Sequence, residues 1–163
     1  VNLTRPMAGK RVLVLGAGGA VRGALLPFIA ARPAELVIAN KDIAKVKALA
    51  AQVAAGGPLI ACGYSELEAM GRFDLVVNAT SASLTGELPP VTPSVFSPAG
   101  VAYELAYGKR LTPFLRLARN AGVARVADGV GMLVEQAAEA FAWWRGVRPE
   151  TRAVIERLTV SLD

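Results

Sequence analysis

The chain has 163 residues and a hydrophobic fraction of 53%, which fits one folded domain and excludes a disordered chain. It contains no histidine and one cysteine, Cys62, so zinc sites, disulfide scaffolds and histidine-dependent nucleophiles are excluded within it. The 18 basic residues behind the net charge of +5 are scattered, which disfavours nucleic acid as a partner, and no apolar run reaches the ~18 residues that would span a membrane. We therefore expect a cytoplasmic, mildly basic protein with an anionic cofactor.

The first predicted element is a buried strand that runs into a glycine-rich turn. The strand covers 12–15, the turn is Gly16-Ala17-Gly18-Gly19, and a helix follows over 20–31. Glycines let a ligand approach the main chain, and the free amides at the helix start suit a phosphate. The turn predicts a dinucleotide-binding crossover, although Val21 stands where the G-x-G-x-x-G pattern has its third glycine. A tight turn without a ligand is the alternative.

Strands and helices alternate through the rest of the chain. We expect strands over 35–39, 59–61, 74–78, 101–105 and 123–127, helices over 42–55, 112–121, 131–145 and 149–162, a helix start at 65–68 and a loop over 79–90. This alternation predicts an α/β fold with a doubly wound parallel sheet of six strands, ordered 3-2-1-4-5-6. The whole of 1–163 would be one Rossmann-like domain with helices at its C-terminal end.

The end of the second strand distinguishes NAD from NADP. An NAD site places an acidic residue there for the ribose 2′-hydroxyl, whereas this strand runs into Asn40-Lys41-Asp42, with Lys45 one helical turn beyond Lys41. Two ammonium groups favour the 2′-phosphate of NADP, and the alternative is that both lysines only solvate the helix. Asp42 would repel a phosphate if its carboxylate pointed inward, but it also suits a helix N-terminus.

Beyond the fourth strand, specific motifs follow one another in order: Asn78-Ala79-Thr80-Ser81, Gly86, Tyr103…Tyr107, Thr112-Pro113-Phe114-Leu115, the run from Asp128 to Ala138, and Trp144-x-Gly146-Val147-x-Pro149. This series resembles the C-terminal, NADP-binding domain of shikimate dehydrogenase over nearly the whole chain. The resemblance implies hydride transfer between NADP(H) and 3-dehydroshikimate or shikimate, a step of chorismate and aromatic amino acid biosynthesis.

The resemblance also implies the site residues. Those for the cofactor are Gly16, Ala17, Gly18, Gly19 and Ala20 at the diphosphate, Asn40, Lys41, Asp42 and Lys45 at the adenosine ribose phosphate, and Thr80, Leu105, Gly129 and Met132 near the nicotinamide. Tyr107 and Gln136 match positions that bind shikimate. Without the resemblance, Tyr107 would be an exposed loop residue, Gln136 a solvated helix edge and Met132 part of the core.

Four positions depart from the family pattern. Lys41 replaces an arginine, so the planar guanidinium group with its forked donors becomes an ammonium group that acts as a point charge. Asp42 replaces a threonine, so a hydroxyl donor is lost. Leu105 stands where methionine is common, and Glu104 where aspartate is common. Asp42 keeps open a quinate/shikimate dehydrogenase that uses NAD as well as NADP.

The resemblance implies an N-terminal domain, which we expect to lie outside this sequence and to carry the catalytic lysine and its partner aspartate. Reduction of a carbonyl by hydride also requires a positioned acid, and nothing in the sequence prepares Lys109 or Tyr107 for that role. We therefore expect no catalytic residue here and no turnover by the chain alone, with the N-terminal domain as its partner. A stand-alone dinucleotide-binding module without chemistry is the alternative.

Overall fold

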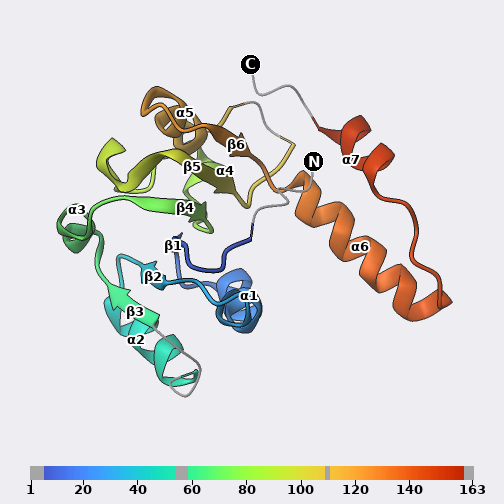
Figure 1. The fold of residues 1–163 in the computed structure, drawn as a ribbon, viewed down its shortest axis with the longest axis horizontal. Coiled ribbons are helices and arrows are strands. Elements are labelled where there is room, and N and C mark those ends of the chain that lie inside the picture. The colour runs from blue at the N-terminus through green and yellow to red at the C-terminus, as the bar shows by residue number, and fades with distance from the viewer. Residues whose placement is uncertain (1–5, 54–58, 109–110, 160–163) are drawn as a thin grey trace.

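The computed structural model describes residues 6–53, 59–108 and 111–159. They form a six-stranded parallel sheet in the order β3-β2-β1-β4-β5-β6, flanked by helices (Figure 1). The strands are β1 (Arg11–Leu15), β2 (Glu35–Ala39), β3 (Leu59–Cys62), β4 (Phe73–Asn78), β5 (Phe96–Glu104) and β6 (Arg125–Ala127). The helices are α1 (Gly19–Ala30), α2 (Ile43–Ala51), α3 (Leu67–Met70), α4 (Ala82–Thr85), α5 (Pro113–Asn120), α6 (Val130–Arg145) and α7 (Arg152–Leu158), with 3-10 turns η1 (Tyr64–Glu66) and η2 (Pro93–Val95). The predicted fold class and strand order are confirmed.

The sheet separates two hydrophobic cores. In β1, Val12 and Val14 pack with residues of α1 and α2 on one face, while Leu13 and Leu15 pack with residues of α3 and α5 on the other. All four side chains are buried. A strand covered on both faces needs apolar residues at successive positions, which explains the uninterrupted aliphatic run.

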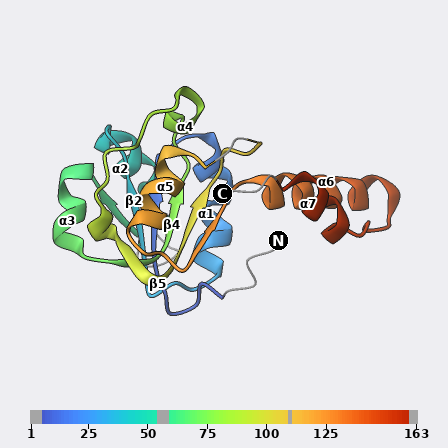
Figure 2. The ribbon, with the colours of Figure 1, turned by 90° about the horizontal axis from the view of Figure 1, so that it is seen from above.

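The helices α6 and α7 extend away from the α/β body (Figure 2). The chain turns back after α6, and Arg148 forms ion pairs with Glu135, at 2.6 Å, and with Glu139. Thr151 also donates a hydrogen bond to Glu135 (Oγ1 to Oε1, 2.8 Å). These contacts hold α7 against α6 as a helical hairpin. Among the described residues, no helix combines the length and apolar character needed to cross a bilayer.

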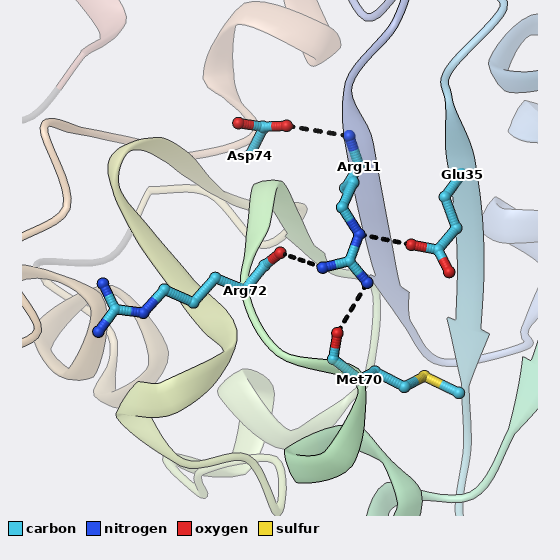
Figure 3. Close-up of polar contacts among 5 residues, drawn as sticks. All are labelled: Arg11, Glu35, Met70, Arg72 and Asp74. Carbon is cyan, nitrogen blue, oxygen red and sulfur yellow. Dashed lines mark hydrogen bonds and ion pairs between the residues drawn. The ribbon is translucent and has the colours of Figure 1, made fainter.

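At the amino edge of the sheet, Arg11 connects three segments (Figure 3). Its Nε donates to Glu35 Oε2 at 2.6 Å, so it joins β1 to β2. Its other nitrogens donate to the carbonyl oxygens of Met70 and Arg72, at 2.8 and 2.7 Å, between α3 and β4. The backbone N–H of Arg11 donates to Asp74 Oδ2 at 3.0 Å. The contacts hold this edge together, opposite the predicted site.

The strand β5 begins five residues before the predicted start. Its pairing with β4 opens with Phe96 opposite Phe73, and the register then shifts between Phe73 and Leu75. Pro98 and Gly100 lie in the irregular part, and both are poor strand formers, which is why the first half of the strand was not predicted. A Cβ on Gly100 would come within 2.8 Å of two backbone carbonyl oxygens, so glycine is required there.

Other predicted elements differ at their ends. The helix predicted over 42–55 is α2, which begins after Asp42, and the strand over 123–127 is shortened to β6. The predicted loop over 79–90 contains α4, which is closed by Gly86 in the left-handed region (φ +78°). The helix over 149–162 is α7. The parts of these predictions that fall on 54–55 and 160–162 lie outside the described residues.

Candidate functional site

The turn between β1 and α1 requires glycine at its first position. Gly16 has φ +107°, and a Cβ there would lie 3.0 Å from the carbonyl oxygen of Ala79, just after β4. Cβ atoms built on Gly18 and Gly19 would meet none of the described atoms within 4 Å. No described side chain caps α1, which starts after Gly18, so its first amides are available to a ligand. The turn has the space and the donors to bind a phosphate.

In the segment after β2, the structure shows what the Asp42 carboxylate contacts. Its Oδ1 accepts hydrogen bonds from the backbone N–H groups of Ala44 and Lys45, at 3.1 and 3.3 Å, and so caps α2. Lys45 Nζ also lies 3.8 Å from Asp42 Oδ2. Lys41 is exposed and forms no ion pair with an acid of the described residues. The Asp42 carboxylate is thus engaged by the helix start, and the ammonium group of Lys41 is available to an anion.

These two segments line one cavity with the loop after β4, which we call the glycine cleft, of about 480 Å³. The predicted cofactor residues that line it are Gly16, Ala17, Gly18, Asn40, Lys41, Asp42, Lys45 and Thr80. They meet because the carboxyl ends of neighbouring parallel strands share one edge of the sheet.

Tyr64 also lines the glycine cleft and was missed from the sequence. It belongs to η1, directly after β3, and burial, with a smaller contribution from Cys62, raises the pKa of its hydroxyl. Ligand sites in parallel sheets lie at the carboxyl ends of the strands, and this rule, applied to the third strand, could have found Tyr64.

A second cavity of about 510 Å³, which we call the sheet groove, lies over β4 and β5 between α1 and α6. Its lining is mostly apolar, and it contains the predicted residues Ala20, Leu105, Met132 and Gln136. Tyr103, also in the groove, is hydrogen-bonded to the backbone of Met132, and burial raises the pKa of its hydroxyl. Ala79 lines both cavities, so the anion-binding features of the cleft adjoin an apolar space.

Three predicted residues line neither cavity. Gly19 starts α1 beside the glycine cleft. Gly129 is buried against β5, where a Cβ would lie 2.1 Å from the carbonyl oxygen of Leu105. Tyr107 is 48% exposed at the same edge of the sheet. Lys109, the other acid considered from the sequence, lies outside the described residues.

Comparisons with known proteins agree with this architecture. The sequence matches the family described as Shikimate / quinate 5-dehydrogenase over residues 2–85, and the Shikimate 5'-dehydrogenase C-terminal domain over residues 129–159. A shikimate dehydrogenase (NADP(+)) of Dechloromonas aromatica (strain RCB) is 54% identical over 162 residues, which are 99% of this chain and 58% of that protein.

Two solved structures are similar along almost the whole chain. The crystal structure of an Ael1 enzyme from Pseudomonas putida has a TM-score of 0.92 and 63% identity, and the match covers 99% of this chain and 59% of that one. A shikimate dehydrogenase in complex with NADP+ has a TM-score of 0.75 and 26% identity, and the match covers 94% and 56%. The chain therefore spans less than two thirds of each of these relatives. It belongs to the shikimate/quinate 5-dehydrogenase family.

Proposed function

We propose that this chain is the NADP-binding half of an NADP-dependent shikimate dehydrogenase, which interconverts 3-dehydroshikimate and shikimate. The observation that carries the proposal is the glycine cleft, which combines a glycine turn at a helix start with Lys41 and Lys45. The family supports it, and so does the NADP(+) in the name of a relative with 54% identity.

The residues of the cleft fit the parts of NADP. The first amides of α1 suit the diphosphate, because no described side chain caps this helix start and the space beside Gly18 and Gly19 is open. Lys41 and Lys45 suit the 2′-phosphate. The nicotinamide would lie where the two cavities adjoin, near Thr80 and Leu105. When bound, NADP(H) accepts or supplies the hydride.

The substrate would bind at the carboxyl edge of the sheet. Gln136 lines the sheet groove beside Met132, one helical turn away on α6. Its amide can donate to and accept from a hydroxyl group. Tyr107 is exposed on the same edge, in the loop that follows β5. We propose that these two side chains bind shikimate from this half of the enzyme.

A second domain of the same polypeptide completes the enzyme in this proposal. The chain corresponds to 58% of the length of the Dechloromonas aromatica relative, and the rest of that relative is long enough to form a further domain. On α6, Trp143 and Trp144 are 89% and 81% exposed, and exposed apolar patches of this kind mark interaction sites. The sheet groove adds a further apolar surface. We propose that the second domain covers both surfaces and supplies the acid that protonates the substrate oxygen.

The alternative that the enzyme also uses NAD depended on Asp42. The cap that Asp42 forms at α2 accounts for an acidic residue at this position, so an NAD site is not needed to explain it. A stand-alone binding module would not explain the exposed Trp143 and Trp144 in the last turn of α6, nor the mostly apolar sheet groove.

The experiment is to follow shikimate-dependent reduction of NADP+ by absorbance, with the full-length protein and with this chain alone. We expect turnover by the full-length protein, and none by the chain at high concentrations of both substrates, because positioning and acid–base catalysis contribute many orders of magnitude. Gln136→Ala in the full-length protein should raise KM for shikimate and leave KM for NADP+ unchanged.

Two results would contradict the proposal. A full-length protein that does not oxidise shikimate with NADP+ would refute the assigned reaction. Turnover by the chain alone would place the chemistry inside it, and Lys109→Ala and Tyr107→Phe would then identify the acid.

A further inference from the structure

A buried polar network joins the ends of β4 and β5. Asn78 and Glu104 are the last residues of these strands, lie opposite each other in the register and are both 0% exposed. Glu104 Oε2 accepts hydrogen bonds from Asn78 Nδ2 at 2.8 Å, Ser83 Oγ at 2.5 Å and Thr112 Oγ1 at 3.3 Å. Its other oxygen, Oε1, accepts from the backbone N–H of Ala106 at 3.2 Å. Four donors therefore converge on one carboxyl group.

The carboxyl group determines which way the Asn78 amide faces. An ionised carboxylate only accepts hydrogen bonds, so the Asn78 NH2 group must face Glu104 and its carbonyl oxygen must face the other way. That oxygen accepts from the backbone N–H of Thr80 at 3.1 Å and from Thr80 Oγ1 at 2.8 Å. Thr80 lines the glycine cleft. Glu104 thus orients Thr80 through Asn78.

The second oxygen acts on the opposite side of the strand end. It holds the N–H of Ala106, whose carbonyl oxygen accepts the N–H of Gly129 at 3.2 Å. Leu105, which lies between Glu104 and Ala106 in the chain, lines the sheet groove. The two oxygens of Glu104 therefore hold the two segments that meet where the cavities adjoin.

We propose that Glu104 is a positioning residue for the nicotinamide half of the cofactor. It lines neither the glycine cleft nor the sheet groove, and it acts through Asn78 on Thr80 and through Ala106 on Leu105. The inference rests on the proposed function, because it needs NADP to bind in the cleft. This role explains why a carboxylate, which accepts hydrogen bonds at both oxygens, stands at this buried strand end.

Glutamine cannot replace Glu104, because one end of its amide is a donor. Whichever way the amide turns, its NH2 group meets a group that can only donate, either the Ala106 N–H or the Asn78 NH2, although the hydroxyl groups of Ser83 and Thr112 could turn to accept. Aspartate keeps both acceptor oxygens, one methylene nearer the strand. Glu104→Gln should therefore disturb the junction, and Glu104→Asp should restore much of it.

The test is calorimetric titration of this chain with NADPH and with 2′-phospho-ADP-ribose, which has the same phosphates and adenosine but no nicotinamide. We expect Glu104→Gln to weaken NADPH about tenfold, the loss of roughly one charge-assisted hydrogen bond, and to leave 2′-phospho-ADP-ribose unchanged. Glu104→Asp should stay within about threefold of wild type for both ligands. The control is Val95→Ala, which opens a buried site before β5 and away from the carboxyl edge; it should affect neither ligand.

A second variant covers the case in which Glu104→Gln does not fold. Ser83→Ala removes one donor to Glu104 and should give the same difference between the ligands at about threefold. Equal weakening of both ligands, or no weakening of NADPH, would overturn the inference while leaving NADP binding intact. A wild-type chain that binds neither ligand would overturn the proposed function and this inference with it.

Discussion

Gly129 and Leu105 are packed backbone against backbone: a Cβ on Gly129 would lie 2.1 Å from the Leu105 carbonyl oxygen. The backbone of Gly129 has φ −75°, which any residue can adopt. Glycine is therefore required at position 129 by the lack of space for a side chain and not by the backbone conformation. Its N–H also donates to the carbonyl of Ala106 at 3.2 Å. This contact joins the start of α6 to the end of β5, where the proposed nicotinamide and substrate residues lie.

Replacement of Gly129 by alanine should therefore destabilise the fold. The added methyl group must displace the backbone of Leu105, just after β5, and overpacking of this kind costs about 1–3 kcal/mol. Gly23→Ala is the matched control, since its Cβ would meet none of the described atoms within 4 Å and alanine in a helix stabilises by about 1 kcal/mol. Thermal unfolding should show opposite shifts of Tm. A Tm for Gly129→Ala equal to that of wild type would contradict the packing.

Arg11 should stabilise the amino edge of the sheet beyond its ion pair with Glu35. The variant Arg11→Met removes the ion pair and the hydrogen bonds to the carbonyls of Met70 and Arg72. We expect a loss of about 1–2 kcal/mol in the free energy of unfolding, measured with urea, because the contacts are partly exposed. Glu35→Gln should lose less, since the carbonyl contacts remain. Equal losses would show that the carbonyl contacts contribute nothing.

Much of the fold follows from sequence pattern. The uninterrupted aliphatic residues of β1 predict a strand buried on both faces, and the regular alternation predicts the strand order. The first half of β5 was missed because Pro98 and Gly100 interrupt its pattern. The helix α4 has four residues, too few to show a helical period.

The candidate site was predictable where it depends on strand ends. Gly16, Asn40 and Thr80 follow β1, β2 and β4, and the structure brings all three to one cleft. Tyr64 was missed because a 3-10 turn carries no periodic signal. The network around Glu104 could not be predicted, because it depends on Ser83 and Thr112 meeting one carboxyl group from separate segments.

Asp42 should influence cofactor affinity through its charge and helix stability through its cap. Asp42→Asn keeps an acceptor for the amides of Ala44 and Lys45, so the Tm should change little. It removes the negative charge 3.8 Å from Lys45 Nζ, so we expect NADPH to bind about threefold more tightly and NADH to be unaffected. Asp42→Ala is the control, and should lower stability by about 1 kcal/mol. Tighter binding of both cofactors would contradict an effect on the 2′-phosphate.

Cys62 should be unreactive in the folded protein. Burial, and secondarily the charge of Glu66, raises the pKa of its thiol from 9.0 to about 11. Near pH 8 the reactive thiolate would then be about a hundredfold rarer than in the unfolded chain. A thiol reagent should therefore label the protein in urea and not in buffer. Rapid labelling of the native protein would contradict this environment.

The same shift predicts a loss of stability at alkaline pH. Because the folded-state pKa is the higher one, the contribution of the neutral thiol is complete below pH 9.0 and is lost as the pH rises toward about 11. The Tm of wild type should fall more steeply over this interval than the Tm of Cys62→Ala. Parallel declines would exclude the thiol as the cause.

The most direct test of NADP binding by this chain is a calorimetric titration with NADPH and with NADH. We expect NADPH to bind more tightly, and Lys41→Ala to weaken NADPH about tenfold while leaving NADH nearly unchanged, because an exposed ammonium–phosphate contact is worth about 1.5 kcal/mol. Lys47→Ala is the matched control: it removes the same charge from α2 at an exposed position that does not line the glycine cleft, and it should change neither affinity. Equal affinities of wild type for the two cofactors, or equal losses for both in Lys41→Ala, would contradict an NADP site in this cleft.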